Sequence, residues 1–128
     1  MKIKENKKAP LFKLPSTSSI DFDLKNIKGK LLIYFYPKDD TPGCTIETRD
    51  FSRLYKKFKK INCELVGISK DSLESHEKFK KKYKVPFELL SDIDIKMQKK
   101  YGIWGTKSFM GKKFLGTIRS TVFIDRGK

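Results

Sequence analysis

An apolar run that leads through a polar turn to a cysteine constrains this chain more than any other feature. Residues 31–36 are apolar at every position, which is typical of a strand covered on both faces, and Pro37 ends the run. Cys44 then opens an amphipathic helix, whose free amides and aligned dipoles favour an anion. We therefore expect an exposed Cys44 thiol that ionises easily and is reactive. The alternative is a cysteine that fills the core as a small hydrophobic residue, which its neighbours Thr41 and Gly43 disfavour because they build no apolar pocket.

Strands and helices alternate along the rest of the chain, which predicts an α/β fold. The helix that begins near Cys44 is followed by a strand over 63–69, and such a strand–helix–strand unit predicts a right-handed parallel crossover. The expected inward positions of this helix are Phe51, Leu54, Tyr55, Phe58 and Ile61. The other expected elements are an extended segment over 9–15, a short strand with Phe22 and Leu24, a helix capped by Asp71 or Ser72 and ended by Val85-Pro86, a strand over 87–90, a helix with Ile93, Met97 and Tyr101 ended by Gly102, a hairpin bracketed by Gly111 and Gly116, and a strand over 121–124.

The length and the charge limit the classes of function. A chain of 128 residues is predicted to form one domain, spanning 1–128. The net charge is +15, but lysines fill the gaps between apolar helix positions, which is typical of a solvated face. We therefore expect no specific nucleic-acid partner, only loose, salt-sensitive binding of polyanions. No apolar run reaches the length of a membrane span and the start of the chain lacks a signal segment, which predicts a cytoplasmic protein without a membrane partner.

The soft ligands are too few for a metal centre. Cys44 and Cys63 are the two cysteines and make no disulfide framework, and His76 is the single histidine. We expect neither a metal nor a cofactor. We expect Cys63 to fill the core at the start of its strand and His76 to lie at the surface, since no neighbour suggests a base.

Residues 35–45 closely resemble the active-site loop of the peroxiredoxins, and in particular that of the peroxiredoxin Q group, also called the bacterioferritin comigratory proteins. The resemblance covers nearly the whole chain, in the family's order, through 9–15, 66–72, 86–92 and 119–125. It implies a thioredoxin-like fold with a central mixed sheet flanked by helices. It also implies the thiol-dependent reduction of hydrogen peroxide and organic hydroperoxides, with thioredoxin or another external thiol as the reductant.

Carried over residue by residue, the resemblance makes Cys44 the nucleophile and lets Thr41, Pro37 and Arg119 shape its pocket. The expected strand arrangement independently supports the proximity of Cys44 and Arg119. Cys44 follows the end of one strand and Arg119 precedes the last strand, so the two converge if those strands are antiparallel. The alternative for Arg119 is a surface arginine with a carboxylate partner. We assign Glu47 to the first turn of its helix rather than to the loop.

Two departures from the family pattern have consequences. Many members carry a resolving cysteine five residues after the nucleophile, where this chain has Arg49, and others carry it on the second helix, where Lys80 and its neighbours include no thiol. We therefore predict a one-cysteine cycle. Members also continue beyond residues 125–127 into another strand and a helix, so we expect these to be missing here. An apolar face is then exposed, and we expect a monomer or weak self-association.

Two alternative functions stay open at this point. A thiol-disulfide oxidoreductase on the same fold would need two closely spaced cysteines, whereas only Cys44 lies in the loop. A basic, non-enzymatic holdase or binding protein is the other alternative.

Overall fold

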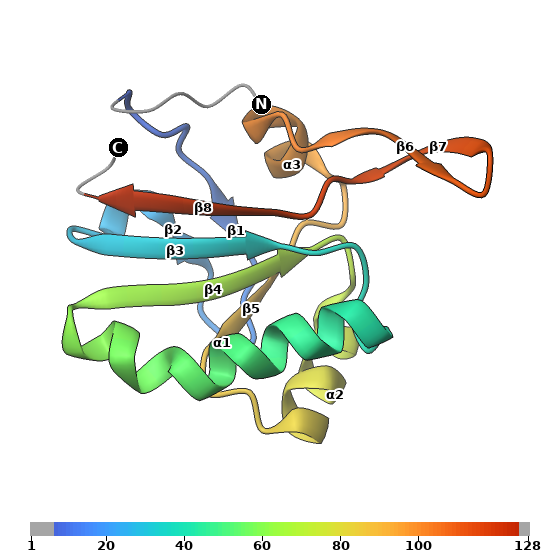
Figure 1. The fold of residues 1–128 in the computed structure, drawn as a ribbon. Coiled ribbons are helices and arrows are strands. Elements are labelled where there is room, and N and C mark those ends of the chain that lie inside the picture. Colours follow the sequence, from blue (N-terminus) through green and yellow to red (C-terminus); the bar gives the residue numbers. More distant parts are fainter. Residues whose placement is uncertain (1–6, 126–128) are drawn as a thin grey trace.

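A four-stranded mixed sheet forms the centre of the computed structural model, which describes residues 7–125 (Figure 1). Its strand order is β5-β4-β3-β8. The strand β3 (Lys30–Phe35) pairs in parallel with β4 (Cys63–Ser69) and antiparallel with β8 (Ser120–Asp125), while β4 pairs in parallel with β5 (Glu88–Ser91). The predicted parallel crossover is confirmed, and the antiparallel β3–β8 pair brings the end of β3 to the start of β8.

Two helices cover one face of the sheet. The long helix α1 (Pro42–Lys60) and the helix α2 (Leu73–Tyr83) pack over Tyr34 and other buried side chains of β3, β4 and β5. α1 contributes an inward stripe of Phe51, Tyr55 and Phe58. Leu54 and Ile61, which we expected to point inward, are 36% and 53% exposed. At about 100° per residue they lie on one flank of that stripe, beyond the reach of the sheet.

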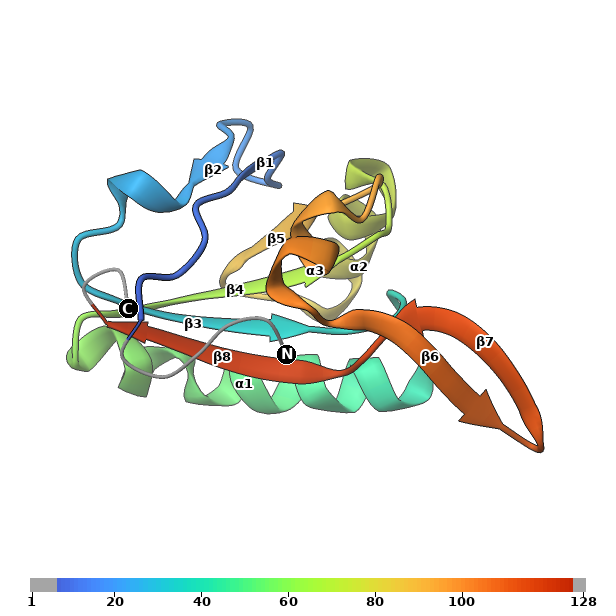
Figure 2. The same cartoon turned by 90° about the horizontal axis from the view of Figure 1, so that it is seen from above.

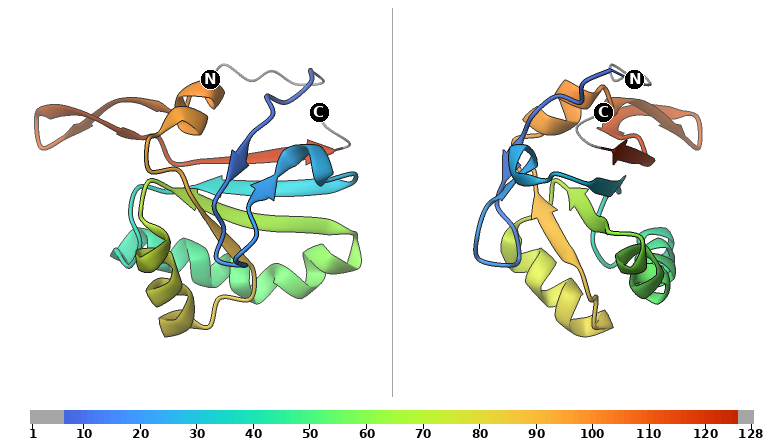
Figure 3. Two further views of the ribbon diagram at one scale, coloured as in Figure 1. Left: turned by 180° about the vertical axis from the view of Figure 1, so that it is seen from behind. Right: turned by 90° about the vertical axis from the view of Figure 1, so that its left-hand side faces the viewer.

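The other face is covered by the N-terminal segment and a short helix, so that the sheet is the middle layer (Figure 3). The covering elements are β1 (Lys13–Leu14), β2 (Phe22–Asp23), the 3₁₀ turn η1 (Leu24–Asn26) and α3 (Lys96–Tyr101). Phe12 contacts both Phe22 and Tyr101 through their rings, which ties the N-terminal segment to α3. Because both faces are covered, β3 is apolar from Leu31 to Phe35, as its sequence predicts.

A glycine on β4 lets the sheet hold α1 closely. A Cβ atom on Gly67 would lie 2.8 Å from the ring of Tyr34, so only glycine fits beside that ring. Tyr34 in turn shares a hydrogen bond of 2.8 Å with the Thr48 hydroxyl of α1. This contact fixes the helix that carries Cys44 against the middle of the sheet.

The expected hairpin and the expected last helix are present, but their ends differ from those predicted. A hairpin of β6 (Trp104–Phe109) and β7 (Lys112–Thr117) projects from the sheet (Figure 2) and turns at Met110 and Gly111, both with positive φ. Gly116 lies inside β7 rather than at its end. The last helix begins only at Lys96, and Ile93 is exposed because it precedes that helix. The sequence Asp125-Arg126-Gly127 also predicts a turn, but residues 126 and 127 lie outside the described residues. Among residues 7–125, no helix is long and apolar enough to cross a membrane.

Candidate active site

Cys44 is the third residue of α1, at the carboxyl end of β3. Tyr36 still pairs with β4, because its amide donates to the Ile68 carbonyl at 3.1 Å, and the chain then turns at Pro37. Thr41 is the N-cap residue, with an extended backbone, and Pro42 is the first helical residue. Proline suits this position because its fixed φ is already helical and the amide it lacks has no helical partner. The thiol thus lies in the first helical turn, as the sequence predicts.

The expectation that Cys44 is exposed is wrong. Its side chain is 1% exposed and belongs to the core cluster of Tyr34 and Tyr36. The reason is its place on α1: Cys44, Thr48 and Phe51 are spaced by four and three residues, so they share the helix face that packs on the sheet. That spacing is present in the sequence and was the signal for burial. Cys44 is therefore both a core residue and a candidate nucleophile.

Arg119 lies over the sulfur of Cys44. Its Nη2 donates a hydrogen bond to Cys44 Sγ at 3.1 Å, and the two residues are 75 positions apart in the chain. The antiparallel register explains the contact, since Phe35 pairs with Ser120 and Arg119 directly precedes it. The predicted convergence of these two residues is present in the structure. Their catalytic roles remain predictions.

Glu47 holds the other end of the same guanidinium. Arg119 Nη1 donates to Glu47 Oε1 at 2.9 Å, so the alternative of a carboxylate partner is also realised. The assignment of Glu47 to the helix turn alone is wrong, because one turn of helix places its side chain beside that of Cys44. The guanidinium thereby faces a sulfur and a carboxylate at once.

The electrostatics keep the arginine charged. Partial burial lowers the pKa of Arg119, but its hydrogen bond to Cys44 and the nearby charges of Cys44 and Glu47 outweigh this and raise the pKa overall. Burial raises the pKa of Glu47, and Arg119 offsets only part of that increase. The site therefore presents a permanent positive charge to the sulfur, together with a carboxylate that is protonated more readily than an exposed one.

The two other predicted site residues lie in the loop before Cys44. The Thr41 hydroxyl donates to the Lys38 carbonyl at 3.0 Å, so its proton is directed along the loop rather than to the sulfur. Pro37 is half-buried at the bend that follows Tyr36. A hollow of about 420 Å³ adjoins the site, lined by Gly43, Ile46, Glu47, Asp50, Phe51, Leu54 and Arg119. Its wall is largely apolar.

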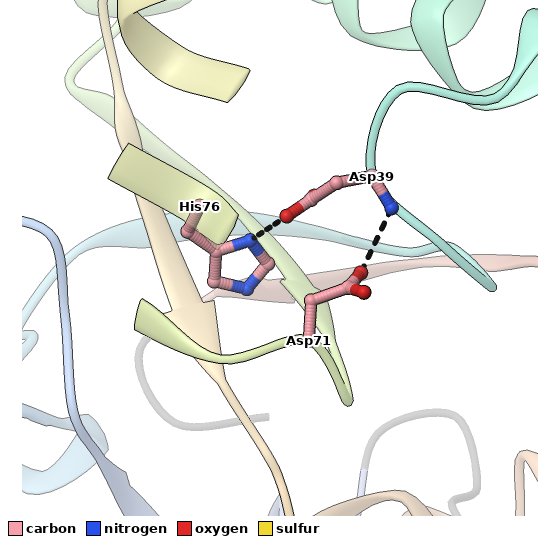
Figure 4. Close-up of side chains that lie close together, drawn as sticks. All are labelled: Asp39, Asp71 and His76. Atoms are coloured by element: carbon pink, nitrogen blue, oxygen red, sulfur yellow. Dashed lines mark hydrogen bonds and ion pairs between the residues drawn. The ribbon is translucent and has the colours of Figure 1, made fainter. Parts of the chain in front are cut away.

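His76 is fully buried, so its expected surface position is wrong. On α2 it shares a face with Leu73, Phe79 and Tyr83, at spacings that place it on the inward stripe. Its Nδ1 lies 2.7 Å from Asp39 Oδ2, in the loop that leads to Cys44. Figure 4 shows this pair with Asp71, whose Oδ2 accepts the Asp39 amide at 2.8 Å.

Asp39, Asp71 and His76 place three ligand-type atoms within 4.8 Å of one another. Hydrogen bonds within the protein already engage these atoms. The arrangement is that of a loop anchor.

Cys63 lies at the opposite end of the sheet from Cys44. It is buried at the start of β4, opposite Lys30 at the start of β3, whereas Cys44 follows the end of β3. Burial, the largest cause, raises the pKa of the Cys63 thiol, which disfavours the thiolate. A six-residue strand spans roughly 20 Å, whereas disulfide-bonded Cα atoms lie within about 7 Å. The two thiols therefore cannot bond in this fold without a large rearrangement.

Comparisons by family, by sequence and by structure find the same kind of protein. Residues 6–128 match the AhpC/TSA family. The chain is 44% identical over 126 residues to the putative peroxiredoxin bcp of Coxiella burnetii, covering 98% of this chain and 83% of the relative. It is 40% identical over 127 residues to the peroxiredoxin Bcp of Bacillus subtilis, covering 98% and 81%. The structure of the Xanthomonas campestris bacterioferritin comigratory protein, studied for alkyl peroxide reduction, superposes with a TM-score of 0.84 at 35% identity, covering 91% of this chain and 74% of that one.

Proposed function

The chain belongs to the AhpC/TSA family, within its Bcp and peroxiredoxin Q group, and from this membership we propose a complete catalytic cycle. It is a thiol peroxidase with the thioredoxin-like peroxiredoxin fold. The observation that carries the assignment of its residues is the 3.1 Å contact between Arg119 Nη2 and Cys44 Sγ in the first turn of α1. A nucleophilic sulfur, a fixed positive charge and a helix N-terminus then meet at one point.

In the first half-reaction the Cys44 thiolate attacks one oxygen of a hydroperoxide. The S–O bond forms as the O–O bond breaks, so that the sulfur becomes a sulfenic acid and the other oxygen leaves and takes a proton to give water or an alcohol. Negative charge moves from sulfur to the departing oxygen, and Arg119 stabilises it along that path. The Thr41 hydroxyl contacts the peroxide after rotating away from the Lys38 carbonyl. Pro37 keeps the bend stiff and limits the entry of water.

In the second half-reaction an external thiol reduces Cys44 directly. One thiol condenses with the sulfenic acid, releasing water and forming a mixed disulfide, and a second thiol displaces Cys44 as the free thiol. The distance and burial of Cys63 support this one-cysteine cycle. Thioredoxin or a small thiol serves as the reductant, and the apolar wall of the adjoining hollow accommodates organic hydroperoxides as well as hydrogen peroxide. The need for a pool of reduced thiols supports a cytoplasmic location.

A single-turnover experiment tests the cycle. The reduced protein receives one equivalent of hydrogen peroxide, and intact mass with peptide mapping locates the product. Wild type and Cys63→Ser, the matched control, are expected to gain one oxygen on Cys44 that a sulfenic-acid trap captures, whereas Cys44→Ser gains none. Arg119→Met is expected to react about 10²–10³-fold more slowly, as for the loss of one charge-stabilising donor. Peroxide consumption by Cys44→Ser at the wild-type rate, or a Cys44–Cys63 disulfide, would contradict the proposal.

A further inference from the structure

The buried pair of His76 and Asp39 has no part in the cycle above, yet it connects α2 to the loop that carries the reactive cysteine. We infer that this pair is a positioning device for Cys44: it locks the loop of residues 37–41 onto α2 and thereby sets the reaction rate of the thiol. The inference rests on the proposed role of Cys44 as the nucleophile. It concerns two side chains that do not contact the sulfur.

From the hydrogen-bond partners of the ring we infer that the two residues share one proton. His76 Nε2 is 2.9 Å from the Leu90 carbonyl oxygen, which can only accept, so this nitrogen carries a hydrogen. A neutral ring would then turn the lone pair of Nδ1 toward Asp39 Oδ2 at 2.7 Å, an unfavourable contact between two acceptors. A second proton, on the ring or on the carboxyl group, removes that conflict. The pair as a whole is then electrically neutral, which burial requires.

The carboxyl group of Asp39 is fully used. Oδ1 accepts from the Tyr36 hydroxyl at 2.6 Å, and Oδ2 accepts from the Ser75 hydroxyl at 2.8 Å as well as facing His76. The Asp39 amide donates to Asp71 Oδ2 at 2.8 Å. Asp39 is therefore held through both its side chain and its backbone by Tyr36 directly after β3, by α2 and by the segment between β4 and α2.

The next residue extends the same anchor. Asp40 has a left-handed backbone with φ of 55°, a conformation that costs free energy unless its surroundings impose it. Its carboxylate accepts from Lys82 Nζ and from the Tyr83 hydroxyl, both at 2.7 Å and both on α2. α2 thus fixes two consecutive residues of the loop that leads to Gly43. The position of the first turn of α1 follows from this anchor on one side and from Arg119 on the other.

Substitutions of His76 and Asp39 change the buried charge in different ways, which makes the inference testable. His76→Gln leaves the Asp39 carboxylate buried without a shared proton, whereas Asp39→Asn leaves a neutral imidazole that accepts from the new amide and still donates to Leu90. The double substitution again buries no charge. If the pair sets the position of Cys44, the reaction rate follows this charge balance. If the pair contributed only to packing, the rates of the three variants would not follow the buried charge.

The experiment measures the second-order rate constant for oxidation of Cys44 by hydrogen peroxide, below the melting temperature of every variant. Because small displacements of reacting groups reduce rates steeply, we expect His76→Gln to react about tenfold or more slowly than wild type. Asp39→Asn is expected to stay within about threefold of wild type, and the double variant to recover to within about threefold of Asp39→Asn. Tyr101→Phe, which loses a hydrogen bond to the Pro10 carbonyl on the other face of the sheet, is the control and is expected to match wild type.

Equal rates for His76→Gln and wild type, or a double variant no faster than His76→Gln, would overturn the inference. If His76→Gln does not fold, Ser75→Ala takes its place, since it removes one donor to Asp39 and keeps the shared proton. It is expected to lower the rate by about threefold, and an unchanged rate would count against the inference. A wild-type protein whose Cys44 is not oxidised would instead refute the proposed function, which separates the two failures.

Discussion

The proposed nucleophile of this protein is enclosed by its neighbours. Cys44 is buried among tyrosines of the sheet, and the half-exposed Arg119 lies between it and the solvent. A buried thiolate without a partner would be costly, so the guanidinium is what makes an anion tolerable there. Glu47 completes the arrangement by orienting Arg119 from one helical turn away. The carboxylate is therefore a positioning residue for the arginine.

The raised pKa of Glu47 predicts a pH dependence of stability. Burial is the main cause, so the folded chain binds this proton more tightly than the unfolded chain, whose pKa is about 4.3. The resulting contribution to the free energy of unfolding is fully present below about pH 4.3 and is lost as the pH rises through the folded pKa. Relative to Glu47→Gln, wild type is expected to become less stable over that window.

Urea unfolding of both proteins across the acidic range measures this difference. Glu74→Gln, an exposed carboxylate paired with Lys78 on α2, is the control and is expected to show little change. A wild type that gains stability relative to Glu47→Gln as the pH rises would contradict the prediction.

At the scale of elements, α1 both packs on the sheet and carries Cys44. Phe51, Tyr55 and Phe58 hold it to the sheet, while its first turn carries Cys44, the proposed nucleophile. That turn has no side-chain cap, because the Thr41 hydroxyl donates to the Lys38 carbonyl and accepts no hydrogen bond from the helix amides. N-cap hydrogen bonds stabilise helices by about 1 kcal/mol, so the first turn of α1 lacks a stabilisation of about that size.

Arg49→Cys tests whether this turn opens. Residues five positions apart are about 7.5 Å apart along a helix axis, beyond the Cα separation of about 5.5–6 Å that is usual in a disulfide, so a bond to Cys44 requires the first turn to unwind. After one equivalent of peroxide we expect this variant to lose two hydrogens and to contain a disulfide between Cys44 and the introduced cysteine, with a fall in helical circular dichroism. Arg53→Cys, a further turn along, is the control and is expected to retain the sulfenic acid. A stable sulfenic acid in Arg49→Cys would show that the turn stays closed.

At the scale of the whole molecule, charge and an open sheet edge act against each other. β8 pairs with β3 on one side and with no other strand in the described part of the chain, and Phe123 on it is 52% exposed. An edge strand with an exposed aromatic residue favours pairing with a second copy. The net charge of +15 opposes such contacts through repulsion between copies.

Salt is therefore expected to promote self-association. The Debye length falls from about 10 Å at 0.1 M to about 3 Å at 1 M salt, which screens the repulsion and leaves the apolar contact intact. Sedimentation velocity is expected to show a larger average mass at high salt for wild type, and none of this increase for Phe123→Lys. Ile20→Lys, an exposed apolar position away from β8, is the control and is expected to behave as wild type. An increase that persists in Phe123→Lys would place the contact elsewhere.

Local patterns were sufficient to predict the order of elements and to single out Cys44 as the candidate nucleophile. The apolar run of β3, the bend at Pro37 and the spacing of apolar residues on α1 depend on neighbours within a few positions, so the sequence predicts them directly. The convergence of Arg119 on Cys44 was also predictable, because it needed only one strand pairing to be antiparallel. Boundaries shifted by a residue or a few, as at α3, where the helix starts after a left-handed Ile95.

The role of His76 depends on the tertiary structure. His76 and Asp39 are 37 positions apart, and no local pattern relates a loop residue to a helix residue at that distance. A histidine acquires its role from the groups that surround it after folding, here a carboxyl group and the Leu90 carbonyl. Local sequence was enough to single out Cys44 as the candidate nucleophile, because a cysteine at a helix start can be recognised from its neighbours in the chain. How Cys44 is held depends on contacts between distant segments, which form only in the folded chain.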